Sequence, residues 1–94
     1  MSEVQQHGDG IVALSTERLT PQIQRIGKSE IEFTFLGPNV HGQPTWILWN
    51  PDEPHLIGML SQGRMGYHFE QRTGSGVQRL ENISLNRVQR ALGG

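Results

Sequence analysis

The segment EIEFTFL, residues 30–36, predicts a β-strand because its hydrophobic residues alternate with polar ones. Ile31, Phe33 and Phe35 fall on one side of an extended chain, and the residues between them are Glu or Thr. A period of two that includes aromatic and β-branched residues is typical of a strand with one buried face. We therefore expect Phe33 in the core and the rest of the sheet to be built around this strand.

Four later segments also have the composition of strands, and short turn-rich connections separate them. The clearest alternation places Met65, Tyr67 and Phe69 on the core side. Residues 45–49 are apolar on both sides, which is typical of a strand covered on both faces. Connections of three to eight residues are too short for parallel crossovers, so an antiparallel meander is expected. The four predicted strands span residues 45–49, 55–60, 64–72 and 77–83.

Two helices are predicted, one on each side of the strands in the sequence. After the last strand, Ser84 is a suitable N-cap and Gly93 a suitable stop for a helix with one apolar face. Before the first strand, Thr20 followed by Pro21 is typical of a helix start and predicts a short helix over residues 20–26. The expected fold class is α+β: a small antiparallel five-stranded meander or half-barrel with a C-terminal helix and a short N-terminal helix.

The length of 94 residues suffices for one small domain. Residues 1–10 are polar and are expected to form a flexible tail, and residues 11–94 a single α+β domain. The chain contains no cysteine, which excludes disulfides and thiolate metal sites. Its longest apolar run, residues 46–49, is too short to cross a bilayer, and the tail lacks the apolar segment of a signal peptide. We therefore expect a cytoplasmic protein without membrane contacts.

The polar residues form no motif for catalysis, cofactors or metal. His41, His55 and His68 are too far apart in the sequence for a local zinc motif. The glycine-rich residues 74–76 join two predicted strands, whereas a dinucleotide site needs a strand followed by a helix. Adjacent carboxylates at residues 52–53 lie in a solvated turn between prolines. No catalytic residue, cofactor or metal is therefore predicted, and a small enzyme would require the three histidines to converge in one pocket.

The charge is unevenly distributed along the chain. Residues 1–60 carry three basic and seven acidic side chains, whereas residues 61–94 carry five arginines and two glutamates. Arginine suits the recognition of phosphate and carboxylate groups, so an RNA- or DNA-binding module is the alternative function. The charges of the two halves could equally pair within the fold. The residues of this predicted basic surface are Arg64, His68, Arg72, Arg79, Arg87 and Arg90.

Two further features favour contact with a protein partner. Trp46 and Trp49 lie on opposite faces of one predicted strand, so one of them is less buried unless a helix covers it, and we take Trp46 as the candidate contact residue. The alternative is that Trp46 packs under the C-terminal helix and Trp49 fills the sheet core. The loop at residues 37–44 is longer than a hairpin needs and places Val40 and His41 at its tip. The leading function is therefore a non-enzymatic binding or accessory module that acts through protein–protein contacts. Assembly into a homo-oligomer is also expected to be possible, because so small a core is stabilised by burying further apolar surface.

Overall fold

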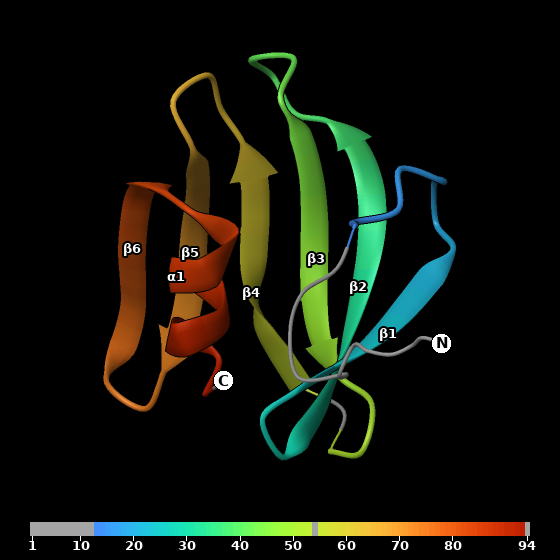
Figure 1. The fold of residues 1–94 in the computed structure, drawn as a ribbon, viewed down its shortest axis with the longest axis vertical. Helices are drawn as coiled ribbons and strands as arrows, with labels where there is room; N and C mark the ends of the chain where they lie inside the picture. The colour runs from blue at the N-terminus through green and yellow to red at the C-terminus, as the bar shows by residue number, and fades with distance from the viewer. Residues whose placement is uncertain (1–12, 54, 94) are drawn as a thin grey trace, which may run out of the picture.

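Six antiparallel strands follow one another in a sheet whose order matches the chain order (Figure 1). The computed structural model describes residues 13–53 and 55–93, so the predicted tail at residues 1–10 lies outside the described residues. Within those two ranges, no helix has the length and apolar character needed to cross a membrane. The elements are β1 (Pro21–Ile26), β2 (Ser29–Pro38), β3 (Pro44–Asn50), β4 (His55–Gln62), β5 (Tyr67–Thr73), β6 (Gly76–Ile83) and α1 (Leu85–Ala91).

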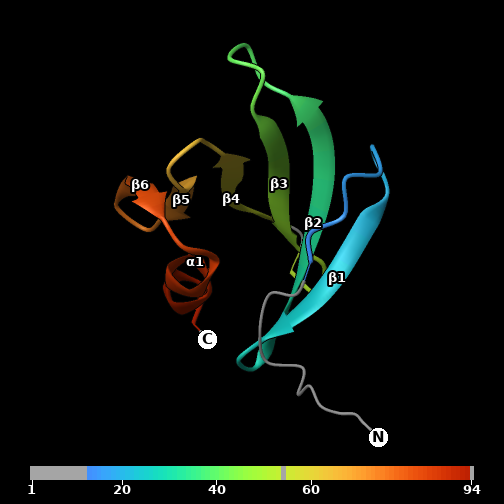
Figure 2. The same ribbon diagram turned by 45° about the horizontal axis from the view of Figure 1, so that its top comes forward.

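The sheet is strongly curved, and α1 lies on its concave side next to β5 and β6 (Figure 2). The side-chain Nε2 of Gln71 on β5 donates a hydrogen bond of 3.0 Å to the carbonyl oxygen of Ala91 at the end of α1. Val88 of α1 is fully buried against the sheet. The predicted small antiparallel sheet with a C-terminal helix is therefore confirmed.

The predicted N-terminal helix is wrong, because the segment is strand β1. It pairs with β2 from Pro21↔Thr34 to Ile26↔Ser29. A segment of six residues is too short to be a stable helix on its own, whereas pairing with β2 gives its backbone groups hydrogen-bond partners. Gly27, with a φ of 63°, belongs to the tight turn between the two strands instead of ending a helix. The sheet therefore has six strands and not five.

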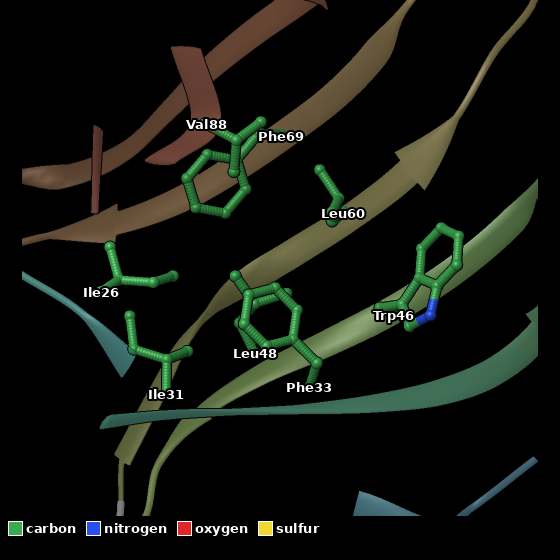
Figure 3. Packing of buried hydrophobic residues seen from close by; sticks show 8 residues of the cluster. All are labelled: Ile26, Ile31, Phe33, Trp46, Leu48, Leu60, Phe69 and Val88. Atoms are coloured by element: carbon green, nitrogen blue, oxygen red, sulfur yellow. The ribbon is translucent and has the colours of Figure 1, made fainter. Parts of the chain in front are cut away.

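The core lies on the concave side of the sheet, which we call the inner face (Figure 3). Ile31 and Phe33 are almost fully buried there, and Phe35 packs against the same cluster. This confirms the orientation predicted from the alternation in residues 30–36. The buried apolar residues are Ile26, Ile31, Phe33, Trp46, Leu48, Leu60, Phe69 and Val88.

The strand predicted at residues 64–72 starts later, at Tyr67. Met65, which was expected in the core, is 81% exposed in the loop between β4 and β5. This prediction is wrong because the backbone N–H of Gly63 bonds the carbonyl oxygen of Gly66 at 2.8 Å and closes a loop before the alternation begins. Alternation alone does not mark where a strand begins.

The C-terminal helix forms as its caps predict. The side-chain oxygen of Ser84 accepts a hydrogen bond of 3.1 Å from the backbone N–H of Arg87. Gly93, with a φ of 100°, follows the last turn in the left-handed region that glycine adopts without strain. The end of β6 therefore connects directly to a helix that returns over the inner face.

Candidate binding surface on the outer face of the sheet

The convex side of the sheet, which we call the outer face, carries apolar side chains on β3 and β4. Alternation along β3 places Ile47 and Trp49 on the side opposite to the buried Leu48. Their neighbours across the β3–β4 ladder are Met59 and Leu56, respectively. Among the described residues, α1 lies on the inner face, so no helix covers these side chains (Figure 2).

Val77 on β6 extends this apolar surface across β5. It pairs with Arg72 of β5, and it lines a cavity of about 180 Å³ together with Leu56 and Met59. Met59 is 37% exposed and Val77 is 55% exposed. The outer-face patch consists of Ile47, Trp49, Leu56, Met59 and Val77.

A bulge in β4 shapes the neighbourhood of this patch. Leu48 pairs with Gly58 but the next residue of β3, Trp49, pairs with Leu56, so β4 has one extra residue there. Gly58 is buried against β5, and a Cβ atom at this position would overlap the backbone carbonyl oxygen of Glu70. Glycine is therefore required where the bulged strand approaches β5.

The strands β4 and β5 separate beyond the bulge (Figure 1). Their pairing ends at Gly58↔Gln71, although β4 begins at His55 and β5 continues to Thr73. A cleft of about 560 Å³ lies at this separation, and we call it the β4–β5 cleft. Its lining residues are His55, Leu56, Arg72, Thr73 and Gly74.

The cleft contains two nitrogen-bearing side chains, Arg72 and His55. Arg72 borders both the cleft and the 180 Å³ cavity, and within the described part of the chain it makes no salt bridge. Its neighbour Arg79 instead pairs with Glu70 at 3.0 Å. The Nδ1 atom of His55 lies 2.7 Å from the carbonyl oxygen of Glu53, so Nδ1 carries a proton and donates. Arg72 is therefore the cation that a ligand in the cleft would meet.

The predicted basic residues do not gather on one face. Arg72 and Arg79 are exposed on β5 and β6, and Arg64 is exposed in the loop between β4 and β5. Arg87 and Arg90 belong to α1, on the inner side of the sheet. The sheet therefore lies between α1, which carries Arg87 and Arg90, and the outer side of β5 and β6, which carries Arg72 and Arg79.

Trp46 was predicted from the sequence to be the less buried tryptophan, and this is wrong. It is only 2% exposed, and its ring packs 5.3 Å from that of Phe35 and 6.5 Å from that of Tyr67, measured between centroids. Trp49 is the partly exposed tryptophan, on the outer face. The two side chains do point to opposite faces. The choice between them was wrong because only the inner face is covered by the described chain.

The remaining predicted contact residues lie away from the cleft. Val40 is 94% exposed and His41 is exposed, at the tip of the β2–β3 loop that Asn39 organises through three side-chain hydrogen bonds. This loop is at the opposite end of the sheet from His55. His68 is partly buried on β5, where its ring packs against Gly63. His41 and His55 therefore do not share a pocket.

Searches for similar family models, curated proteins and solved structures find no match for this chain. In residues 13–53 and 55–93, no three histidine or acidic side chains are arranged to hold a metal ion. The outer face is the candidate functional surface of the described chain. The signal for it in the sequence is residues 45–49, whose outward side chains are as apolar as the inward ones.

Proposed function

We propose that this chain is a non-enzymatic binding module that docks a partner protein on the outer face of its sheet. The observation that supports the proposal is the outer-face patch. Strand β3 is apolar on both sides, but Trp46 and Leu48 on its inner side are buried whereas Ile47 and Trp49 on its outer side stay partly exposed. A contiguous apolar patch with a polar rim is typical of protein interaction sites. A partner would cover the outer side of β3 as the core covers the inner side.

The residue types at the patch fit a protein interface. Trp49 lies on the patch and Arg72 borders it, and tryptophan and arginine are enriched among the residues that dominate interface energies. The ion pair between Glu70 and Arg79 provides a polar rim beside them, with both side chains more than half exposed. An apolar centre with charged groups at its edge is the usual anatomy of a protein interface.

The distribution of charge supports a protein partner over RNA or DNA. A nucleic acid is held by several cations that contact phosphates along one surface. Here Arg87 and Arg90 lie on the other side of the sheet from Arg72, and Arg79 is already paired with a carboxylate. One unpaired arginine beside an apolar patch can make few phosphate contacts, whereas a protein can use both the arginine and the apolar patch.

Affinity capture with matched variants tests the proposal. Extract of the native cell is passed over the wild-type chain, Met59→Glu and Met65→Glu, with and without nuclease. Both methionines are exposed, but Met59 lies on the patch whereas Met65 lies in the β4–β5 loop. We expect the wild type and Met65→Glu to retain one protein after nuclease treatment. Met59→Glu should lose this protein, because burying a carboxylate in an apolar interface is unfavourable unless an opposite charge or hydrogen bonds compensate it.

The opposite pattern would overturn this assignment. Binding that survives Met59→Glu but is lost in Met65→Glu would place the interface at the loops. Capture that nuclease abolishes, and that weakens about 1,000-fold or more between about 50 and 200 mM salt, would identify a nucleic acid as the partner. An apolar protein interface should respond little to the same change in salt.

A further inference from the structure

We propose that the β4–β5 cleft binds a carboxylate of the partner protein while the aliphatic side chain next to that carboxylate enters the 180 Å³ cavity. The inference rests on the proposed function, because it names the chemical group that the docked protein presents. The cleft and the cavity share Leu56 and Arg72, so one ligand can occupy both. A carboxylate joined to an aliphatic group is the smallest unit that matches this pair of spaces.

The position of Arg72 determines the charge of the ligand. Its guanidinium group presents a planar fork of donors that matches the two oxygens of a carboxylate. Arg72 makes no salt bridge in the described part of the chain, whereas Arg79 on the next strand is neutralised by Glu70. Arg72 is therefore free to form a charge-assisted hydrogen bond with a ligand.

The separation of β4 and β5 supplies backbone groups for the same ligand. The ladder between the two strands ends at Gly58↔Gln71, so residues 55–57 and 72–73 have no cross-strand partner on their cleft side. On their other sides His55 and Leu56 pair with β3, and Arg72 and Thr73 pair with β6, whereas Ile57 is the extra residue of the bulge. An extended peptide can place its own N–H and C=O groups against such free strand edges.

The cavity beside Arg72 selects for an aliphatic side chain. Leu56, Met59 and Val77 line it with apolar side chains, and Gly58 contributes only backbone. Glu70 also lines the cavity, so a second carboxylate there would be repelled. The ligand is therefore oriented, with its carboxylate at Arg72 and its aliphatic group toward Met59 and Val77.

Titration followed by ¹H–¹⁵N correlation spectra tests the inference with N-acetyl-leucine as the probe. The probe has one carboxylate and one aliphatic side chain, and a ligand of this size is expected to bind with a dissociation constant on the order of 1 mM. We expect saturable shifts of the backbone amides at the cleft. These are the amides of Gly58, Arg72, Thr73 and Gly74.

Three control ligands separate the contributions. N-acetyl-leucinamide lacks the carboxylate, and its affinity should be lower by a factor of at least about ten, since a hydrogen bond to a charged group is lost. N-acetylglycine lacks the aliphatic side chain and should also bind about tenfold more weakly. Inorganic phosphate tests the other source of anionic oxygens. If phosphate shifts the same amides as strongly as N-acetyl-leucine, the site is a general anion site and the inference is wrong.

Two variants link the binding to the proposed residue. Arg72→Gln should bind N-acetyl-leucine no better than the wild type binds the amide. Arg25→Gln removes an exposed arginine on β1, at the far edge of the sheet, and should bind like the wild type. The dispersion of the same spectra reports whether each variant is folded. Equal binding by Arg72→Gln, shifts only outside the cleft, or no saturable shift would each overturn the inference.

The outcome also separates this inference from the proposed function. If N-acetyl-leucine does not bind but Met59→Glu still abolishes capture of the partner, the cleft inference fails and the outer-face interface remains supported. If the probe binds but capture does not depend on Met59, the cleft recognises a carboxylate and the interface proposal fails.

Discussion

Trp46 donates a hydrogen bond of 2.8 Å from its indole Nε1 to the backbone carbonyl oxygen of Ser15, 31 residues earlier in the chain. The side chain of Gln22 on β1 reinforces this contact. It accepts from the backbone N–H of Ser15 at 3.0 Å and donates to the carbonyl oxygen of Ala13 at 2.9 Å. Residues 13–15 are thereby held over the inner face and help to bury Trp46. Trp49, on the outer face of the same strand, has no such cover and stays partly exposed.

The two tryptophans should differ in their access to solvent. Trp46→Phe leaves only the partly exposed Trp49, and Trp49→Phe leaves only the buried Trp46. Acrylamide should therefore quench the fluorescence of Trp46→Phe several-fold more than that of Trp49→Phe. Trp46→Phe should also lose at least about 1 kcal/mol of unfolding free energy, because the Ser15 carbonyl loses its donor. Equal quenching of the two variants would contradict the assignment of the two faces.

Phe33→Ala should lower the free energy of unfolding by about 3–5 kcal/mol, because a fully buried phenyl ring is replaced by a cavity. Urea denaturation measures the change. Thr34→Ala is the matched control, since its side chain points to the outer face and should cost less than about 1 kcal/mol. A reversed order of the two values would mean that the register of β2 is shifted by one residue.

Gly58→Ala should destabilise the fold by about 1–3 kcal/mol, because the added methyl group overlaps the carbonyl oxygen of Glu70 and the β4–β5 ladder prevents an easy shift. Gly74→Ala is the control. No atom lies within 4 Å of a Cβ at that position, and its change should stay within about 1 kcal/mol. Thermal denaturation of both variants compares them, and a wild-type stability for Gly58→Ala would exclude the close approach of the two strands.

Ser84→Ala should cost about 1 kcal/mol, because the backbone N–H of Arg87 loses its capping acceptor. Chemical denaturation measures the loss. Ser29→Ala removes an exposed hydroxyl at the start of β2 and serves as the comparison, with an expected change within about 0.5 kcal/mol. The cap is unimportant if the two substitutions have the same effect.

The ion pair between Glu70 and Arg79 should contribute little to stability, because both side chains are more than half exposed to water. A double-mutant cycle with Glu70→Gln and Arg79→Gln should give a coupling energy below about 1 kcal/mol, and less at high salt. A larger coupling would show that the pair is shielded from solvent, which would require the outer face to be covered in the free protein.

Some structural features could be predicted because they depend on neighbouring residues in the chain. Alternation in residues 30–36 predicted the buried position of Phe33, and Ser84 with Gly93 predicted the ends of α1. The same local rules failed for residues 20–26. Proline after threonine suits a helix start, but a short segment takes the structure that its surroundings stabilise, and β2 offers it a strand edge.

The amino-acid sequence was therefore sufficient to predict the side-chain orientation in β2, the terminal helix and the opposite orientation of Trp46 and Trp49. The sequence did not reveal which tryptophan is covered, or where β4 and β5 separate to leave Arg72 beside a cleft, because these features depend on how the strands and α1 pack. Side-chain periodicity is a property of consecutive residues, so a short segment is enough to predict it. The burial of a face depends on segments such as residues 13–15 and α1, which are distant in the chain.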